Sequence, residues 1–106
     1  MTTGRLGAVD LVAATNTSVY TVPATTFSVV TLSICNRGST AATLRVSVSA
    51  LATPANNEFI EFDTSLAPKG VLERTGIVLD AGKFLVVNSN VSSVTAVAYG
   101  IETSTV

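Results

Sequence analysis

The stretch that decides the fold runs from Phe27 to Asn36 and reads FSVVTLSICN. Apolar side chains occupy every second position in it, which places Val30, Leu32 and Ile34 on one side of an extended chain. Smaller or more polar residues lie between them. A period of two is typical of a β-strand that buries one of its faces, so the sequence predicts such a strand over residues 27–36.

The next stretch of the chain repeats this alternation. Leu44, Val46 and Val48 point one way in an extended chain, and Arg45, Ser47 and Ser49 point the other way. The residues between the two stretches include NRGST at positions 36–40, which is rich in turn formers. We therefore predict that residues 27–36 and 44–49 pair as a β-hairpin.

Similar short runs of β-branched and aromatic residues continue in both directions along the chain. They predict six further strands, at residues 5–12, 18–22, 59–63, 71–75, 84–87 and 94–102. Turn signals recur at a spacing of about 8–12 residues, which is typical of an antiparallel sandwich or barrel. The sequence thus predicts one all-β domain over residues 1–106, a single antiparallel β-sandwich of about eight strands, either jelly-roll-like or Ig-like.

The same alternation predicts which side chains form the core. The expected core residues are Val30, Leu32, Ile34, Leu44, Val46, Val48, Ile60, Phe62, Val97 and Tyr99. Residues 1–10 stand apart as a possible docking arm. In that role Leu6 and Val9 would anchor the arm on a neighbouring subunit, and Arg5 would add a charge-assisted bond at its rim. The alternative is that the arm begins the first strand of its own sandwich.

Composition excludes several functional classes. Lys and Arg total 6, Asp and Glu total 7, and the net charge of −1 is too low for a nucleic-acid-binding surface. One Cys and no His exclude a zinc finger or a disulfide scaffold. No apolar run approaches the roughly 18 residues that span a bilayer. We expect no cofactor, no metal, no nucleic-acid partner and no membrane partner.

The sequence also offers no candidate active site. Glu58, Glu61, Asp63 and Glu73 form an acidic group, but Glu61 and Asp63 share one strand face, as solvent-facing residues do. A glycosidase would need two carboxylates across a cleft, and calcium would need a loop of closely spaced ligands. Cys35 has no histidine to activate it, so a packing role is expected. We predict that the protein is not an enzyme.

Surface charge is scarce for a lone domain. Charged residues make up 12% of the chain, against roughly 25% in an average soluble protein. Stable interfaces are depleted of charge, so we expect part of the surface to be buried in a homo-oligomer, with a homotrimer favoured. Arg37, Glu73 and Arg74 are candidates for interface ion pairs.

Several motifs resemble small virion proteins of tailed bacteriophages. The segment VYTVPA at residues 19–24 precedes the alternating strand and its NRG turn, and LERTG and LDAGK follow at residues 72–76 and 79–83. This resemblance implies a non-enzymatic capsid decoration (cement) protein that binds the major capsid protein or other virion subunits. A tail, neck or fibre-associated subunit is the alternative.

The resemblance also sets the expected location. A virion protein is made in the host cytoplasm, and Asp10 interrupts any apolar run of the kind a signal peptide needs. A carbohydrate-binding module is a third functional class. Such modules usually present Trp or Tyr platforms, and the chain contains two Tyr and no Trp.

Overall fold

The structure is a computed structural model that describes residues 3–105. These residues form eight β-strands and one short 3-10 turn. The elements are β1 (Thr3–Asp10), β2 (Thr17–Thr21), β3 (Thr26–Asn36), β4 (Ala42–Ser49), η1 (Asn56–Glu58), β5 (Phe59–Leu66), β6 (Val71–Leu79), β7 (Phe84–Ser89) and β8 (Val94–Ser104). The predicted all-β class is therefore confirmed.

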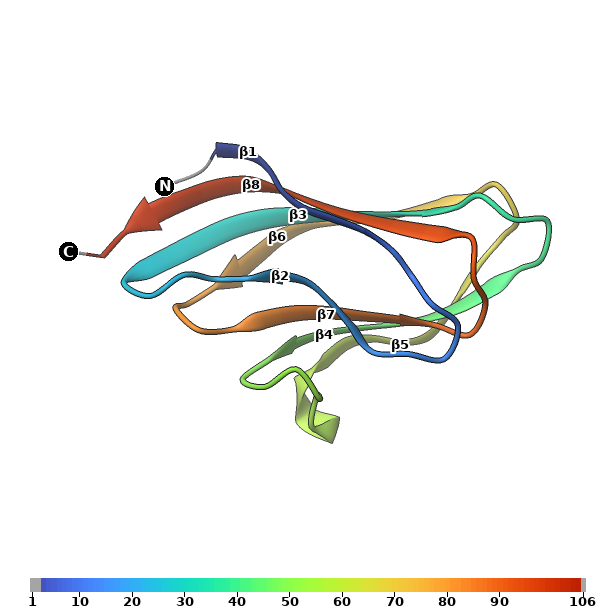
Figure 1. Cartoon of the computed structure of the whole chain (residues 1–106), viewed down its shortest axis with the longest axis horizontal. Coiled ribbons are helices and arrows are strands. Elements are labelled where there is room, and N and C mark those ends of the chain that lie inside the picture. Colours follow the sequence, from blue (N-terminus) through green and yellow to red (C-terminus); the bar gives the residue numbers. More distant parts are fainter. Residues whose placement is uncertain (1–2, 106) are drawn as a thin grey trace.

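The strands build two four-stranded antiparallel sheets that pack face to face (Figure 1). Sheet A has the strand order β1-β8-β3-β6, and sheet B has the order β2-β7-β4-β5. Successive strands alternate between the sheets except at β4 and β5, which are neighbours in sheet B. This order is that of an eight-stranded jelly roll, so the sandwich is of the jelly-roll type and not Ig-like.

Strand pairing is nested along the chain. β1 pairs with β8, β2 with β7, β3 with β6 and β4 with β5. Partners such as Thr3 and Ile101, or Thr43 and Ser65, lie symmetrically about a midpoint in the segment at residues 50–58. The chain is therefore one long hairpin that folds over on itself, and it brings the start of β1 and the end of β8 to one end of the molecule (Figure 1).

The core lies between the sheets and confirms most of the predicted inward positions. Leu32, Ile34, Leu44 and Val46 are at most 1% exposed. Val48 and Ile60 are half-buried against this cluster. Because a shift of one residue would turn every side chain of a strand to the other face, burial of both leucines confirms the inward face predicted for each strand.

The predicted hairpin between residues 27–36 and 44–49 is wrong. β3 lies in sheet A and pairs with β6 and β8, whereas β4 lies in sheet B and pairs with β5 and β7. The segment between the two strands crosses from one sheet to the other, so their apolar sides face each other across the core. A crossing segment uses the same turn-forming residues as a hairpin loop, and for this reason the pattern did not separate the two.

The predicted inward face of β8 is also wrong. Val97 is half-buried and Tyr99 is 38% exposed, while Ala96 and Ala98 are fully buried. The buried alanines lie opposite the large core residues of β3, Ala96 beside Ile34 and Ala98 beside Leu32. Small side chains on β8 thus make room for large ones on β3, and the bulky residues of β8 turn outward.

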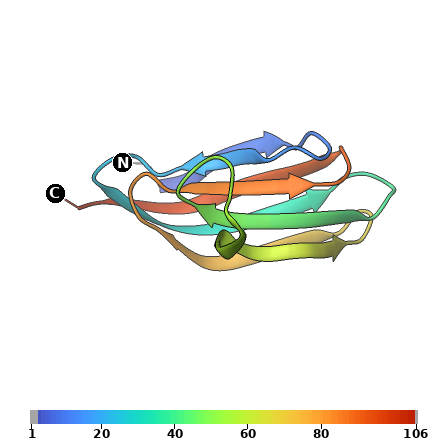
Figure 2. The ribbon, with the colours of Figure 1, turned by 90° about the horizontal axis from the view of Figure 1, so that it is seen from below.

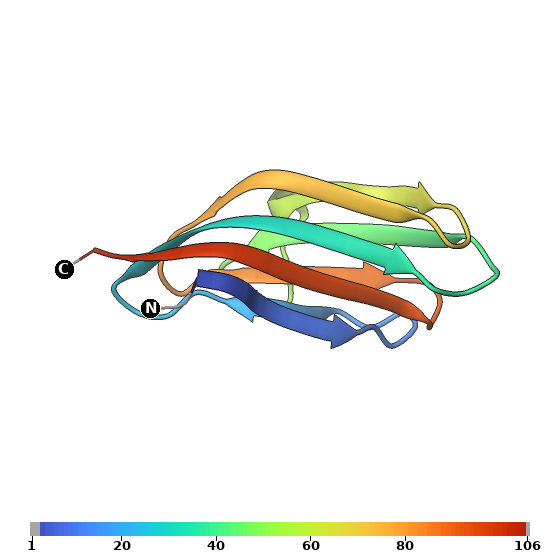
Figure 3. The same ribbon diagram turned by 90° about the horizontal axis from the view of Figure 1, so that it is seen from above.

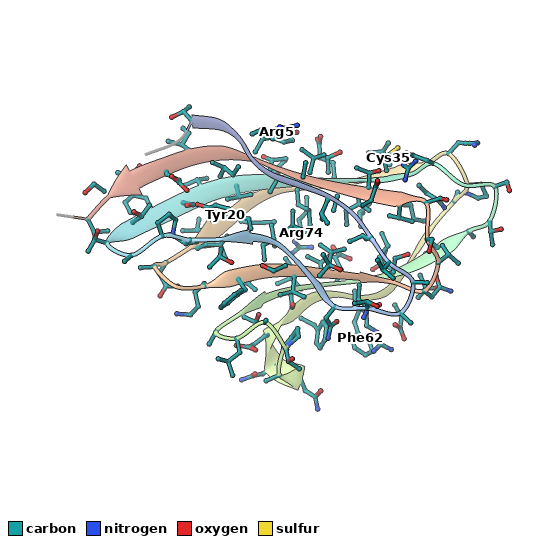
Figure 4. The ribbon with its side chains drawn as sticks, viewed as in Figure 1. Arg5, Tyr20, Cys35, Phe62 and Arg74 are labelled. Atoms are coloured by element: carbon teal, nitrogen blue, oxygen red, sulfur yellow. The ribbon has the colours of Figure 1, made fainter. Side chains whose placement is uncertain are left out.

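Phe62 does not enter the core either, and its side chain is 57% exposed. The register between β4 and β5 shifts between Leu44 and Val46, where β5 holds one extra residue. Asp63 within this bulge has a φ of 56°, in the left-handed region. The bulge changes the alternation of β5, so Phe62 projects from the outer face of sheet B (Figure 4).

A buried polar side chain lies at each end of the sandwich and forms hydrogen bonds there. Tyr20 of β2 lies between the sheets (Figure 4), with its hydroxyl 2.7 Å from the Ser28 hydroxyl, and it donates a hydrogen bond to Glu102. Burial, the largest cause, and the Glu102 bond raise the pKa of Tyr20 to about 12. At the opposite end the fully buried Asn36 amide donates to the Thr40 carbonyl at 2.8 Å.

Residues 3–10 form an edge strand of the chain's own sandwich. β1 pairs with β8 along its length, interrupted by one register shift between Arg5 and Gly7 (Figure 3). Residues 3–10 thus begin the first strand of the sandwich, as described by the alternative weighed from the sequence. Met1 and Thr2 lie outside the described residues.

Candidate functional site

The outer face of sheet A carries an unusual number of exposed apolar side chains. We call this set the apolar face. It consists of Phe27 and Val29 on β3, Val78 on β6, and Tyr99 and Ile101 on β8, with exposed fractions from 37% to 65%. Monomeric soluble proteins rarely expose large contiguous apolar patches, and such patches commonly mark interaction sites. The apolar face is therefore the candidate interaction site.

Strand register makes this face continuous across three strands. Val29 lies directly opposite Ile101 on one side and opposite Val78 on the other. Directly opposed residues of an antiparallel pair project from the same face with their Cβ atoms about 5 Å apart. The three side chains thus form one apolar row across β8, β3 and β6.

Opposite charges lie at the two edges of this face. Arg5 is on the edge strand β1, across from Tyr99, and it makes no ion pair with any residue in the described part of the chain (Figure 4). Glu73 is on the other edge strand, β6, and accepts a hydrogen bond of 3.0 Å from the Tyr99 hydroxyl. That bond is the main cause that raises the pKa of Tyr99.

A polar cluster closes the face at the far end of the sheet. Arg37 donates to Asp10 at 2.9 Å and to the Thr95 hydroxyl at 2.7 Å. Both charged side chains are more than half exposed. An exposed ion pair of this kind contributes little to stability, typically 0–1 kcal/mol, so its chief effect is to mark a polar border.

The outer face of sheet B differs because the chain covers part of it. The segment between β4 and β5, with η1, folds back over this face (Figure 2). The Glu58 carboxylate fixes the segment by accepting from the backbone amides of Ala50 at 3.0 Å and Ala55 at 2.7 Å, and these bonds lower the pKa of Glu58. Val86 projects outward between the core residues Leu85 and Val87, yet it is only 1% exposed.

The structure separates the six predicted interface residues. Arg5 and Glu73 lie on the outer face of sheet A, and Arg37 lies at its polar end. Leu6 and Val9 pack against the chain's own core, because β1 belongs to the sandwich, and they do not form an outward anchor. Arg74 points between the sheets, where it forms an ion pair with Glu61 of β5 (Figure 4).

Sequence reasoning missed the apolar members of the face. Phe27 and Val29 alternate with the inward residues of β3. Apolar residues on both faces of this strand were the signal that its outer face is also apolar. Tyr99 and Ile101 gave a misleading signal, because the larger side chains of β8 suggested the inner face.

The acidic and cysteine side chains do not gather into a metal site among residues 3–105. There is no group of three carboxylate, cysteine or histidine side chains close enough to share a metal ion. Asp63 is paired with Arg45, as Glu61 is with Arg74. Cys35 is half-buried on the outer side of β3 (Figure 4).

Comparisons with known proteins leave the family of this chain open. A scan of protein-family models, a search of curated proteins and a search of solved structures each returned no match. Within residues 3–105, no helix has the length and hydropathy that a membrane span requires.

Proposed function

We propose that the protein is a non-enzymatic bacteriophage virion structural protein that assembles through the apolar face. The observation that carries the proposal is the row of Val29, Ile101 and Val78 on the outer side of sheet A. Such a surface is costly to leave in water, at about 25 cal/mol per Å² of apolar area, and burial against a partner removes that cost. The sequence motifs that resemble those of phage virion proteins favour the virion as the place of assembly.

The favoured assembly is a homotrimer. Arg5 and Glu73 lie on opposite edges of the same face, so the β1 edge of one copy can meet the β6 edge of the next. Contacts between two different edges close into a ring when the rotation between copies allows it, and the row of apolar residues then turns toward the ring axis. Like charges on the two edges would repel each other and disfavour such a ring.

The oligomer is tested by light scattering of the purified protein at micromolar concentration. We expect a trimer for the natural sequence and a monomer for Ile101→Lys, which places a charge in the apolar row. Val12→Lys is the matched control, because Val12 is 62% exposed but lies outside the face. A monomeric natural protein, or an Ile101→Lys variant that remains trimeric, would contradict assembly through this face.

Within the virion, we propose a capsid decoration protein that stabilises the head shell. Particles labelled with an antibody against the protein, viewed by electron microscopy, should carry label on the heads. Label confined to tails or necks would favour the alternative, a tail, neck or fibre-associated subunit. Absence of label from purified particles would overturn the virion assignment altogether.

A further inference from the structure

A polar hollow lies on the uncovered part of the outer face of sheet B. Its volume is about 470 Å³, within the range of small-molecule sites, and its lining comes from four separate segments. The lining residues are Ala14, Thr43, Arg45, Asp63, Asn88 and Asn90. Unlike the apolar face, this hollow is built mainly from planar amide, carboxylate and guanidinium groups.

Arg45 is held in place before any ligand arrives. Its guanidinium donates to the two carboxylate oxygens of Asp63 at 2.6 and 3.3 Å, and its central carbon lies 4.1 Å from the centre of the Phe62 ring. The Arg45 bond holds the pKa of Asp63 below its usual value. The ion pair therefore stays charged at neutral pH, and its two charges cancel.

The two asparagines are oriented as well. Asn90 Oδ1 accepts from the Thr43 backbone amide at 2.7 Å, which leaves the Asn90 Nδ2 group without an acceptor among the described residues. Asn88 Nδ2 donates to Asn16 Oδ1 at 2.9 Å, which leaves Asn88 Oδ1 without a donor in the same part of the chain. The hollow thus presents a fixed donor and a fixed acceptor.

Two of the five residues other than glycine that have a positive φ in the described part of the chain line the hollow. Ala14 has a φ of 58° and Asp63 a φ of 56°, so two lining residues occupy the left-handed region. For a residue with a Cβ such as alanine this conformation costs roughly 1–2 kcal/mol. Strained backbone of this kind gathers at binding and catalytic sites, where the surrounding structure maintains it.

We propose that this hollow binds a neutral carbohydrate. Each hydroxyl of a sugar ring both donates and accepts, so a pair of neighbouring hydroxyls matches a fixed amide donor beside a fixed carbonyl or carboxylate acceptor. The cancelled charges of Arg45 and Asp63 favour a neutral ligand over a phosphate or an acidic sugar. The low number of aromatic residues argued against sugar binding, but two of the four phenylalanines lie beside this site.

Those phenylalanines extend the site beyond one sugar ring. Phe59 and Phe62 pack edge to face with their ring centres 5.1 Å apart, and together with Asn56 they line a second hollow. Apolar ring faces next to oriented polar groups suit a sugar, which has hydroxyls on its edge and C–H groups on its faces. The aromatic pair therefore fits a second unit of an oligosaccharide.

This inference does not rest on the proposed function, because the hollow and the apolar face lie on opposite sides of the sandwich. A homotrimer would add avidity by presenting three hollows, which matters for an open site with an expected Kd on the order of 1 mM for a single sugar. Sugar binding by a monomeric protein would support the hollow and leave the assembly proposal to its own test.

The test follows the side-chain amide signals of the ¹⁵N-labelled protein by NMR. The probes are methyl α-glucoside, methyl α-mannoside and methyl β-galactoside, each added up to about 50 mM, well above the roughly 1 mM Kd expected. We expect at least one glycoside to shift the Asn88 and Asn90 signals in a saturable manner. Inorganic phosphate and sialic acid, added in the same way, should give no saturable shift.

Asn90→Asp supplies the decisive variant. The aspartate keeps the acceptor that holds the Thr43 amide but loses the donor offered to the sugar, so binding should weaken by at least about tenfold while the fold is retained. Asn57→Asp makes the same change on the exposed η1 turn and should bind normally. No saturable shift with any glycoside, equal binding by Asn90→Asp, or tighter binding of phosphate or sialic acid would overturn the proposal.

Discussion

Tyr20 shows how a single side chain can join the two sheets. Its ring extends from β2 toward sheet A, and its hydroxyl reaches Ser28 on β3 and Glu102 on β8. The Ser28 side chain is fully buried. Loss of the Tyr20 hydroxyl would therefore remove a partner from a group that water does not reach.

We expect Tyr20→Phe to lower the free energy of unfolding by about 1–3 kcal/mol, the usual cost of an unsatisfied buried polar group. For a domain of this size that corresponds to a fall in Tm of roughly 4–8 °C per kcal/mol. Tyr99→Phe, at an exposed position, should change stability by less than about 0.5 kcal/mol. Thermal unfolding followed by circular dichroism would compare the two variants.

The raised pKa of Tyr20 also predicts a loss of stability in alkali. The folded-state pKa is about 12 against an ordinary value of 10.0, so the fold favours the protonated phenol. The stabilisation is complete below pH 10 and is lost as the pH rises toward 12. Between pH 10 and pH 12, the free energy of unfolding measured in urea should fall more steeply with pH for the natural protein than for Tyr20→Phe. Equal slopes would show that Tyr20 does not cause the loss.

At the scale of elements, the pairing of β8 with β3 depends on a close backbone approach at Gly100. A Cβ at this position would lie 2.0 Å from the Val29 carbonyl oxygen, which no side chain can accommodate without moving the strands apart. We expect Gly100→Ala to cost about 4 kcal/mol, in the range of severe backbone and packing defects.

Gly82→Ala is the control for that substitution. Gly82 also has a positive φ, of 79°, but nothing lies within 4 Å of the position its Cβ would take. Its cost should stay near 1 kcal/mol, because only the backbone conformation is disfavoured. Urea unfolding of both variants would separate the two effects, and similar losses would show that the close approach is unimportant.

The edge strand β1 yields a second prediction at this scale. Deletion of residues 1–9 removes the side chains of Leu6 and Val9 from the core and exposes one hydrogen-bonding edge of β8. We expect a loss of at least about 3 kcal/mol, from two partly buried apolar side chains and the strand pairing. Arg5→Ala keeps the strand and should change stability by less than about 0.5 kcal/mol. An unchanged Tm for the deleted protein would instead favour a docking arm.

The sequence predicted individual strands better than their connections. Alternation placed Leu32 and Leu44 correctly because each strand has one strongly apolar side. It failed for β8, where Ala96 and Ala98 are inside and Tyr99 is outside, because the choice of face depends on the large residues of the neighbouring strand β3. Alternation along one strand contains no information about that neighbour.

The candidate sites were harder still to predict. Arg45, Asp63 and Asn88 lie on three different strands, and only the jelly-roll order brings them together. The outward turn of Phe62 depends on a bulge at Asp63, and one aspartate within a run of strand-forming residues does not predict a bulge. Arg5 and Glu73 were named as candidate interface residues and both are exposed, but their placement at opposite edges of one face required the strand order.

At the scale of the whole molecule, the opposite charges at the edges of sheet A predict the geometry of self-association. Arg5→Glu alone, or Glu73→Arg alone, should weaken the proposed trimer by placing like charges together. The double variant Arg5→Glu/Glu73→Arg exchanges the charges and should restore association, with a coupling in the range of 0.5–3 kcal/mol found for residues in contact. Sedimentation equilibrium of the natural protein, both single variants and the double variant would measure the free energy of association. If the losses of the single variants simply added in the double variant, Arg5 and Glu73 would not pair between copies.

Nested pairing has a mechanical consequence for this protein. The start of β1 and the end of β8 lie side by side, so a force applied between the two termini pulls adjacent strand ends apart. Such a force breaks the hydrogen bonds between β1 and β8 one after another, beginning near Thr3 and Ile101. The bonds do not share the force. The sandwich should therefore begin to unfold at a low force when it is pulled by its two ends.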